Sequence, residues 1–294
     1  MKKLLSLILL ICFALSANAQ LLWKISGKGL EKPSYIFGTY HLSSPSIKDS
    51  IAAMPQAIKE TNQVYGEVVM ADMMNPAAMQ NMQKQMMMPA DTALHSLFTP
   101  EQYETVGKAI KENMQADIAM LAQLKPAAIT QQLGILIAIK HTPGFNPQVQ
   151  LDSYFQQQAQ QQGKKVGGLE SIESQINLLF NSQSLQRQAN LLHCTVSEID
   201  RSVEQVKKII AYYNAQDLDG LLAAMEERYG DSCDPLPGEM ESILDNRNIA
   251  WVEKMPTIMT EAPTLFVVGA GHLPGTNGVL NLLKQQGYTV EAMK

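Results

Sequence analysis

Two stretches of the chain share a pattern in which an unbroken apolar run ends in Gly-x-x-His. The first is Ser34–Leu42, SYIFGTYHL, and the second is Thr264–Leu273, TLFVVGAGHL. Runs without polar alternation are typical of strands that are buried on both faces, inside a sheet covered by helices. We therefore predict two such strands, with His41 and His272 at the points where strand gives way to loop. The carboxyl ends of buried strands open onto the crevice in which α/β proteins place their chemistry.

The glycines of these two motifs are expected to have a structural role. Gly38 and Gly269 precede the histidines, and side-chain alternation along a strand directs them to the opposite face. A residue without a Cβ atom lets another backbone or helix approach closely, and Gly271 belongs to the same structural motif. A single histidine after an apolar run is ordinarily structural, but two matched copies indicate a shared site.

The remaining pattern completes a predicted sheet and a helical region. Four further runs are predicted as strands: Gln20–Gly27, Gln63–Met70, Val166–Ser171 and 288–294. The first of them is expected to be an edge strand in a hairpin with Ser34–Leu42. Most of the chain between residues 92 and 259 has helical periodicity. The sequence thus predicts an α/β (α+β) fold with one domain over residues 20–294. Its central mixed sheet is formed by strands from both ends of the chain, with a large helical middle region.

Two carboxylates accompany the predicted strands. Glu67 interrupts the apolar run Gln63–Met70, where an ionised carboxylate is costly unless it is paired or bound to a cation. Glu67 is therefore either on an exposed face of the sheet or a ligand or base beside His41. Glu170 ends the predicted strand Val166–Ser171 and is the second candidate.

Two polar or sulfur-rich segments lie between these strands. Residues 70–88 contain eight methionines, which suggest either soft copper(I) coordination or a helix or flap with an adaptable apolar surface. That surface would cover a substrate groove or fill a core. The later segment 151–165 predicts a polar-faced helix that opens near Asp152, with its glutamines on a solvated surface.

The N-terminus has the order of a secretory signal peptide over residues 1–19. Basic residues come first, followed by the apolar run Leu4–Leu15 and the small-x-small sequence Ala17–Ala19. The mature protein is expected to begin at Gln20 and to be secreted or periplasmic. Cys12 lacks the small residues that normally precede a lipoprotein cysteine, so lipid anchoring is the less favoured alternative. No later segment approaches the roughly 20 apolar residues of a membrane span, so none is expected after signal removal.

The charge of the chain argues against one class of function, and its cysteine content predicts a covalent cross-link. Removal of the signal peptide leaves 21 basic and 28 acidic residues, a formal net charge of −7, which argues against nucleic-acid binding. Cys194 and Cys233 then remain, and an even pair in an oxidising compartment predicts a disulfide.

Several motifs in order carry a family resemblance. They are LLWKISG before SYIFGTYHLSS, Glu67 in a strand, GLES followed by Gln175, DNRNIAWVEKM, and LFVVGAGHLPGTNGVLNLLKQQGYTV. With these motifs the chain resembles the TraB/GumN family, which is similar to the Tiki proteases and more remotely to erythromycin esterase and the ChaN haem-binding protein. The resemblance implies a divalent-metal-dependent metallopeptidase with His41 and His272 as its histidines and Glu67 as its acidic partner. Glu170 and Arg247 match recurrent family positions.

The implied chemistry is coherent with these residue types. Two imidazoles and one carboxylate leave open positions on a manganese, cobalt or zinc ion, which can polarise a carbonyl and activate water. Glu170 would serve as general base or orient a histidine, and Arg247 is a further catalytic candidate. The sequence has no His-Glu-x-x-His or Gly-x-Ser-x-Gly motif. A secreted metal-dependent hydrolase acting on peptides is the leading hypothesis. The alternative is an envelope protein that binds a peptide, saccharide or haem without turnover.

Overall fold

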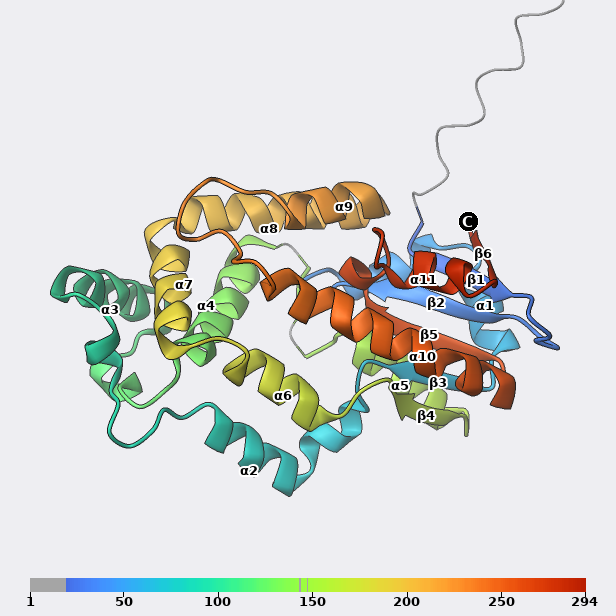
Figure 1. Ribbon diagram of the computed structural model, residues 1–294, viewed down its shortest axis with the longest axis horizontal. Helices are drawn as coiled ribbons and strands as arrows, with labels where there is room; N and C mark the ends of the chain where they lie inside the picture. The colour runs from blue at the N-terminus through green and yellow to red at the C-terminus, as the bar shows by residue number, and fades with distance from the viewer. Residues whose placement is uncertain (1–19, 143, 147) are drawn as a thin grey trace, which may run out of the picture.

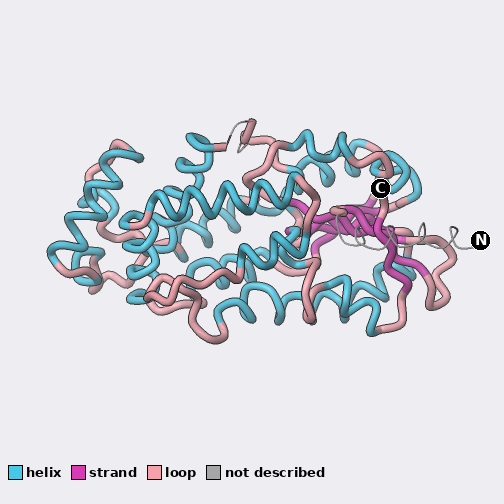
Figure 2. Tube along the Cα trace, turned by 90° about the horizontal axis from the view of Figure 1, so that it is seen from above, coloured by secondary structure: helices cyan, strands magenta, loops and turns pink. Residues whose placement is uncertain are grey.

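The fold is described by a computed structural model that covers residues 20–142, 144–146 and 148–294. The predicted signal peptide, residues 1–19, lies outside the described residues. A β-sheet occupies one end of the molecule, and helices extend away from it to the other end (Figure 2).

The sheet has six strands in the order β4-β3-β5-β2-β1-β6. The four strands β4, β3, β5 and β2 are parallel, whereas β1 is antiparallel to both β2 and β6. The strands are β1 (Leu22–Ser26), β2 (Ser34–Thr39), β3 (Gln63–Gly66), β4 (Lys165–Gly168), β5 (Thr264–Gly269) and β6 (Thr289–Ala292). The predicted α/β class, with a mixed sheet formed by both ends of the chain, is confirmed.

The two Gly-x-x-His segments lie side by side in this sheet. β2 pairs with β5 in parallel, and Thr39 lies opposite Gly269. Both strands are almost entirely buried, as their unbroken apolar runs predict. Because the strands run in the same direction, His41 and His272 both follow them at the carboxyl edge of the sheet.

Three details of the predicted strands are wrong. The segment Gln20–Gly27 forms its hairpin with β2 but does not lie at the edge of the sheet, because β6 pairs with the other side of β1. The segment Gln63–Met70 is a strand only as far as Gly66, so Glu67 follows the strand and does not interrupt it. The segment Val166–Ser171 is a strand only as far as Gly168, so Glu170 also lies beyond the strand end.

Helices cover both faces of the sheet (Figure 1). α10 (Asn246–Glu261) and α11 (Val279–Gln285) lie in front of it in that view, and α1 (Met54–Glu60) and α5 (Leu151–Gln161) lie behind. Trp251 of α10 and Phe155 of α5 are almost fully buried, and the Phe155 ring meets the Phe37 ring edge-on at 5.4 Å. Burying a large apolar side chain contributes about 1.5–3 kcal/mol. These contacts fix the helices that carry site residues against the strands.

The middle of the chain forms a helical region with its own core. Val106, Ile129, Leu133 and Leu192 pack together there, and Pro126 begins one of its helices, as the sequence indicates. Within the described residues, no helix is long and apolar enough to cross a membrane. The helices are α2 (Pro76–Gln85), α3 (Pro100–Met114), α4 (Pro126–His141), α6 (Ile172–Asn181), α7 (Leu185–Ser197), α8 (Ile199–Asn214) and α9 (Leu218–Met225).

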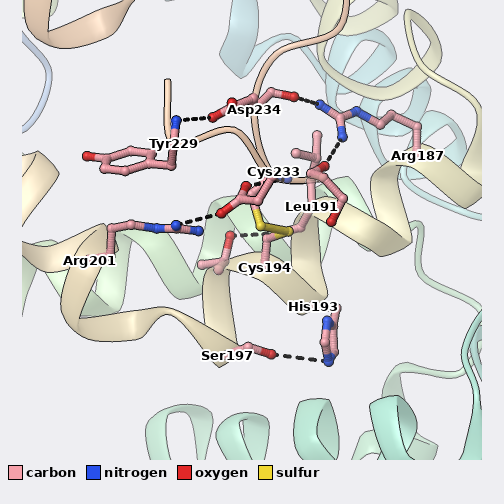
Figure 3. The surroundings of a disulfide bond; sticks show 12 residues. Arg187, Leu191, His193, Cys194, Ser197, Arg201, Tyr229, Cys233 and Asp234 are labelled. Atoms are coloured by element: carbon pink, nitrogen blue, oxygen red, sulfur yellow. Dashed lines mark hydrogen bonds and ion pairs between the residues drawn. A yellow bond between two sulfur atoms is a disulfide. The ribbon is translucent and has the colours of Figure 1, made fainter. Parts of the chain in front are cut away.

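The predicted disulfide between Cys194 and Cys233 is present. It joins α7 to the loop that follows α9 (Figure 3). Arg187 of α7 holds the same loop, because its guanidinium donates hydrogen bonds to the carbonyls of Ser232 and Asp234, each at 2.7 Å. The loop is thus tied to α7 by both covalent and polar contacts.

The methionine-rich segment forms a short 3₁₀ helix, Met70–Met74, followed by α2. Met74 is 72 % exposed, whereas Met82 and Met86 pack against a small apolar cluster that includes Phe180. Of the two interpretations, this mixture of exposed and packed methionines favours the adaptable apolar surface. Copper(I) coordination by this segment stays a prediction.

Candidate functional site

The ends of three parallel strands bring four of the predicted site residues together. Glu67 directly follows β3, Glu170 comes shortly after β4, and His272 follows β5. Arg247, near the start of α10, places its guanidinium among them. These four residues are called the strand-end cluster below.

Arg247 links the two carboxylates of the cluster. Its Nη2 atom lies 2.5 Å from Glu67 Oε2 and 2.5 Å from Glu170 Oε1. Gln175 Nε2 donates to the same two oxygens at 2.9 Å, and the Gly269 N–H donates to Glu67 Oε1 at 2.8 Å. The Glu67 side chain is 12 % exposed, so the interpretation of Glu67 as a residue on an exposed sheet face is wrong.

Glu67 carries its charge in this buried place because its neighbours stabilise it. Burial alone would raise the pKa of Glu67, but His272, Arg247 and the Gly269 N–H outweigh it and lower the pKa to about 2. Glu67 is therefore ionised at neutral pH and available as a ligand or base. The pKa of Arg247 is raised despite burial, because it hydrogen-bonds Glu170 and lies beside the charge of Glu67.

His272 is buried and held in one orientation. Its Nδ1 lies 2.7 Å from Asn248 Oδ1, which only accepts hydrogen bonds, so we assign the ring proton to Nδ1. Its Nε2 then carries a lone pair and lies 3.0 Å from Arg247 Nη1 and 3.8 Å from Glu67 Oε1. Burial, partly offset by Glu67, lowers the pKa of His272 to about 4. The imidazole is consequently neutral at pH 7, the form that binds metal ions.

His41 lies at the exposed side of the cluster. Its side chain is 56 % exposed, and its Nδ1 is 3.2 Å from Oδ2 of the buried Asp152, an ion pair without hydrogen-bond alignment. Thr39 Oγ1 donates to the other Asp152 oxygen at 3.1 Å. Asp152 raises the pKa of His41 to about 9, and Glu67 and Arg247 are near enough to act on it too. His41 thus shares the electrostatic environment of the cluster.

Asp152 and Asn248 are site residues that the sequence alone does not reveal. Asp152 lies in the first turn of α5, where an acidic residue is ordinarily a solvated response to the helix dipole. Instead it is 5 % exposed, and Asn248 is 1 % exposed. The adjacency of Asn248 to Arg247 was the one available signal.

The expected solvated glutamine surface of α5 is wrong at Gln156. This side chain is 3 % exposed; its amide donates to Val68 O and accepts from Met70 N, each at 2.8 Å. Gln156 therefore fixes the segment that leaves Glu67. A glutamine run has the same sequence signal whether it is solvated or buried by tertiary packing.

The motif glycines allow close contacts around the site. A Cβ atom at Gly38 would lie 3.0 Å from Ala270 Cα, in the turn that carries His272. A Cβ atom at Gly269 would lie 3.2 Å from Glu67 Oε1, and one at Gly271 would lie 2.9 Å from the Met225 side chain. A larger residue at Gly38 would press on the backbone of that turn, whereas one at Gly271 would meet only the flexible end of the Met225 side chain.

The donor set fits a divalent cation, although an arginine now contacts it. His272 Nε2 and Glu67 Oε1 are 3.8 Å apart, and two ligands bonded at about 2 Å each can lie that far apart around one ion. Across the described part of the chain, no three His, Cys, Asp or Glu side chains form a ready metal cluster. The Arg247 guanidinium contacts both His272 Nε2 and Glu67.

Fold and cluster together define an α/β protein whose polar site lies at the carboxyl ends of parallel strands. A family model described as TraB/PrgY/gumN matches residues 21–292, and the chain belongs to this family.

Curated relatives are metalloproteases. The chain is 22 % identical to Metalloprotease TIKI1 and 23 % identical to Metalloprotease TIKI2, both of Danio rerio, over 92 % of its own length. It is 24 % identical to Metalloprotease TIKI1 of Xenopus tropicalis. The aligned part spans 60–62 % of the length of these three relatives. No solved structure matches the chain significantly.

Proposed function

We propose that the chain is an exported, metal-dependent hydrolase acting on peptides, in which His41, His272 and Glu67 hold a divalent cation. The observation that carries this proposal is the matched support of the two imidazoles. Each Nδ1 faces a buried side-chain oxygen, of Asp152 for His41 and of Asn248 for His272. His41, whose pKa is raised to about 9, must release a proton when it binds the cation, whereas His272 is already neutral. Histidines that bind metals almost always have such a partner on the other ring nitrogen, because it fixes the tautomer and the ring orientation.

The chemistry of the site follows from these roles. A bound manganese, cobalt or zinc ion would polarise a peptide carbonyl and lower the pKa of a water molecule. Glu67 contributes negative charge that is already in place at neutral pH, since its pKa is lowered to about 2. Glu170, positioned by Arg247 and Gln175, is assigned as the general base or as a group that orients substrate. The metalloprotease relatives and the disulfide are compatible with this activity in an exported protein.

Arg247 gives the proposal a specific requirement. Its Nη1 lies 3.0 Å from His272 Nε2 and its Nη2 lies 2.5 Å from Glu67. These are the groups that a cation would need, so metal binding requires Arg247 to release His272. The contact with Glu170 can persist, because Arg247 Nε also lies 3.2 Å from each Glu170 oxygen.

Calorimetric titration of the mature chain with manganese, cobalt or zinc tests the ligand set. His41→Ala, His272→Ala and Glu67→Gln should each weaken metal binding by more than about 10-fold, because each deletes a ligand. His193→Ala is the matched control, since His193 lies on α7 and contacts Ser197. Wild-type protein that binds none of these metals, or variants that keep wild-type affinity, would sink the proposal.

A peptide- or haem-binding protein without turnover is the second candidate. It is favoured by the contacts of Arg247, which already pair with both carboxylates without a metal ion. Incubation with a broad peptide library separates the two candidates. Cleavage that stops with a chelator and returns with metal supports the hydrolase. Metal binding without any cleavage supports the binding protein.

A further inference from the structure

A cavity of about 560 Å³ lies in the helical region and shares no lining residue with the strand-end cluster. It is bounded by the end of α2, the start of α4, the end of α6 and the start of α7, which meet in Figure 1. Its volume is in the range typical of small-molecule sites. The lining residues include the last part of the methionine-rich segment, Met87 and Met88.

Lys125 is the unusual residue of this cavity. It is only 9 % exposed, and burial lowers its pKa. Its Nζ donates to Asn181 Oδ1 at 2.5 Å, and no carboxylate pairs with it among the residues that the structure describes. A buried ammonium group is costly unless it is paired with an anion. Lys125 therefore lacks the partner that its environment calls for.

The Lys125 ammonium group belongs to a short hydrogen-bond network. Its backbone N–H donates to Met86 O at 2.8 Å. Asn181 Nδ2 donates to Gln85 Oε1 at 2.9 Å and to Asn177 Oδ1 at 3.2 Å, so its carbonyl oxygen is turned towards Lys125. Asn181 itself is exposed, so the ammonium group reaches from a buried stem to the edge of the cavity, where a ligand can meet it.

The rest of the lining combines one further lysine with apolar and neutral polar residues. Lys84 also lines the cavity, and none of the lining residues is Asp or Glu. The first residues of α7, Ser184 and Leu185, add the positive end of a helix dipole. The apolar part of the lining consists of Met87, Met88, Pro89, Phe180 and Leu185. The cavity thus offers a cationic centre beside an apolar surface that adaptable thioether side chains can mould.

We propose that this cavity binds a small monocarboxylate with an apolar body. The carboxylate pairs with Lys125 and Lys84, and the body packs on Met87, Met88 and Phe180. Such a ligand supplies the missing anion and covers the apolar lining in one step. A free fatty acid and the C-terminal end of a short apolar peptide share this chemistry. The site is separate from the proposed metal centre, so each can fail without the other.

Calorimetry on the mature chain tests the site with two carboxylates, decanoate and N-acetyl-Leu-Leu. Decanol and the amide of the same dipeptide are the uncharged controls. At least one carboxylate should bind wild-type protein at least about 10-fold more tightly than its uncharged control, about 1.4 kcal/mol. The acid that binds identifies the source of the ligand.

Lys125→Met is the decisive variant, because it keeps the apolar stem of the side chain and removes the charge. It should weaken carboxylate binding by at least about 10-fold. Lys59→Met, on the exposed face of α1, should leave binding unchanged. If Lys125→Met does not fold by circular dichroism, Lys84→Met replaces it. Lys84 is exposed, and its loss should weaken binding by at least about 3-fold.

Three results overturn the proposal. The first is that neither carboxylate binds at millimolar concentration. The second is that the uncharged controls bind as tightly as the acids. The third is that the folded lysine variant binds the carboxylate with wild-type affinity. In that case the cavity is an apolar groove and Lys125 has only a structural role.

Discussion

Replacing Arg247 with methionine tests how the strand-end cluster is held together. Methionine keeps an apolar stem but deletes the guanidinium, whose Nη2 lies 2.5 Å from both Glu67 and Glu170. The two carboxylate side chains are 12 % and 9 % exposed. Removing one partner of a buried ion pair typically costs about 3–5 kcal/mol, because the remaining charge is left uncompensated.

The lowered pKa of Glu67 gives an independent estimate of how much the contacts of Glu67 stabilise the fold. Its pKa falls from 4.5 to about 2 although burial opposes the shift. The groups that lower the pKa are His272, Arg247 and the Gly269 N–H. His272 is neutral above its own pKa of about 4, so its share of the shift does not act at pH 7, and the shift corresponds to at most about 3 kcal/mol of stability. That stability is present above the unfolded pKa and is lost as pH falls towards the folded value of about 2. Without Arg247 the folded pKa rises towards the unfolded value, so this contribution is smaller at pH 7 and less stability is lost as pH falls below the unfolded pKa.

Urea unfolding of both proteins between pH 2 and pH 7 measures these effects, because this range covers the folded and unfolded pKa values of Glu67. We expect Arg247→Met to lower the free energy of unfolding by about 3 kcal/mol at pH 7. Arg228→Met is the matched control, because Arg228 is exposed and donates a hydrogen bond to the Pro235 carbonyl. A loss below about 1 kcal/mol, with an unchanged pH dependence, would refute the view that Arg247 compensates the buried carboxylates.

Two further predictions concern the supports of the site and the fold. Asn248→Ala should weaken metal binding by about 10 to 100-fold in calorimetry, because His272 loses the oxygen that orients its Nδ1; unchanged affinity would argue against His272 as a ligand. The double variant Cys194→Ala, Cys233→Ala should lose about 4 kcal/mol in urea unfolding, since the bridge closes a loop with a sequence separation of 39. Equal stability of this variant and the oxidised wild type would contradict the chain-entropy estimate.

The predicted strands succeed where the evidence is local. β2 and β5 are unbroken apolar runs, and their burial on both faces follows from composition alone. The position of β1 inside the sheet is different. It depends on pairing with β6, whose residues lie at the other end of the chain. Pairing over that separation leaves no local pattern in the sequence. A short strand beside a turn, such as Gln20–Gly27, therefore has the sequence signal of an edge strand.

In the candidate site, too, the residues with a local sequence signal could be predicted, and those that depend on tertiary packing could not. Glu67, Glu170, Arg247 and His272 were named from strand ends and motifs, and they lie together in the structure. Asp152 was missed because a buried aspartate in the first turn of a helix has the same sequence signal as a solvated one. Only the packing of α5 against the sheet turns it towards the strand ends.

The geometry of the strand ends requires positive charge, whatever its source. Two carboxylates that are nearly buried converge there, and like charges at such a site cannot both stay ionised without compensation. Arg247 supplies that charge in the structure, and a divalent cation would supply it through the same atoms of Glu67 and His272. The two sources therefore compete at His272 Nε2, whereas Arg247 can keep its contact with Glu170 when a cation is bound. A metal that binds more tightly to Arg247→Met than to wild-type protein would show this competition directly, and it would assign Arg247 as the group that moves when the site is loaded.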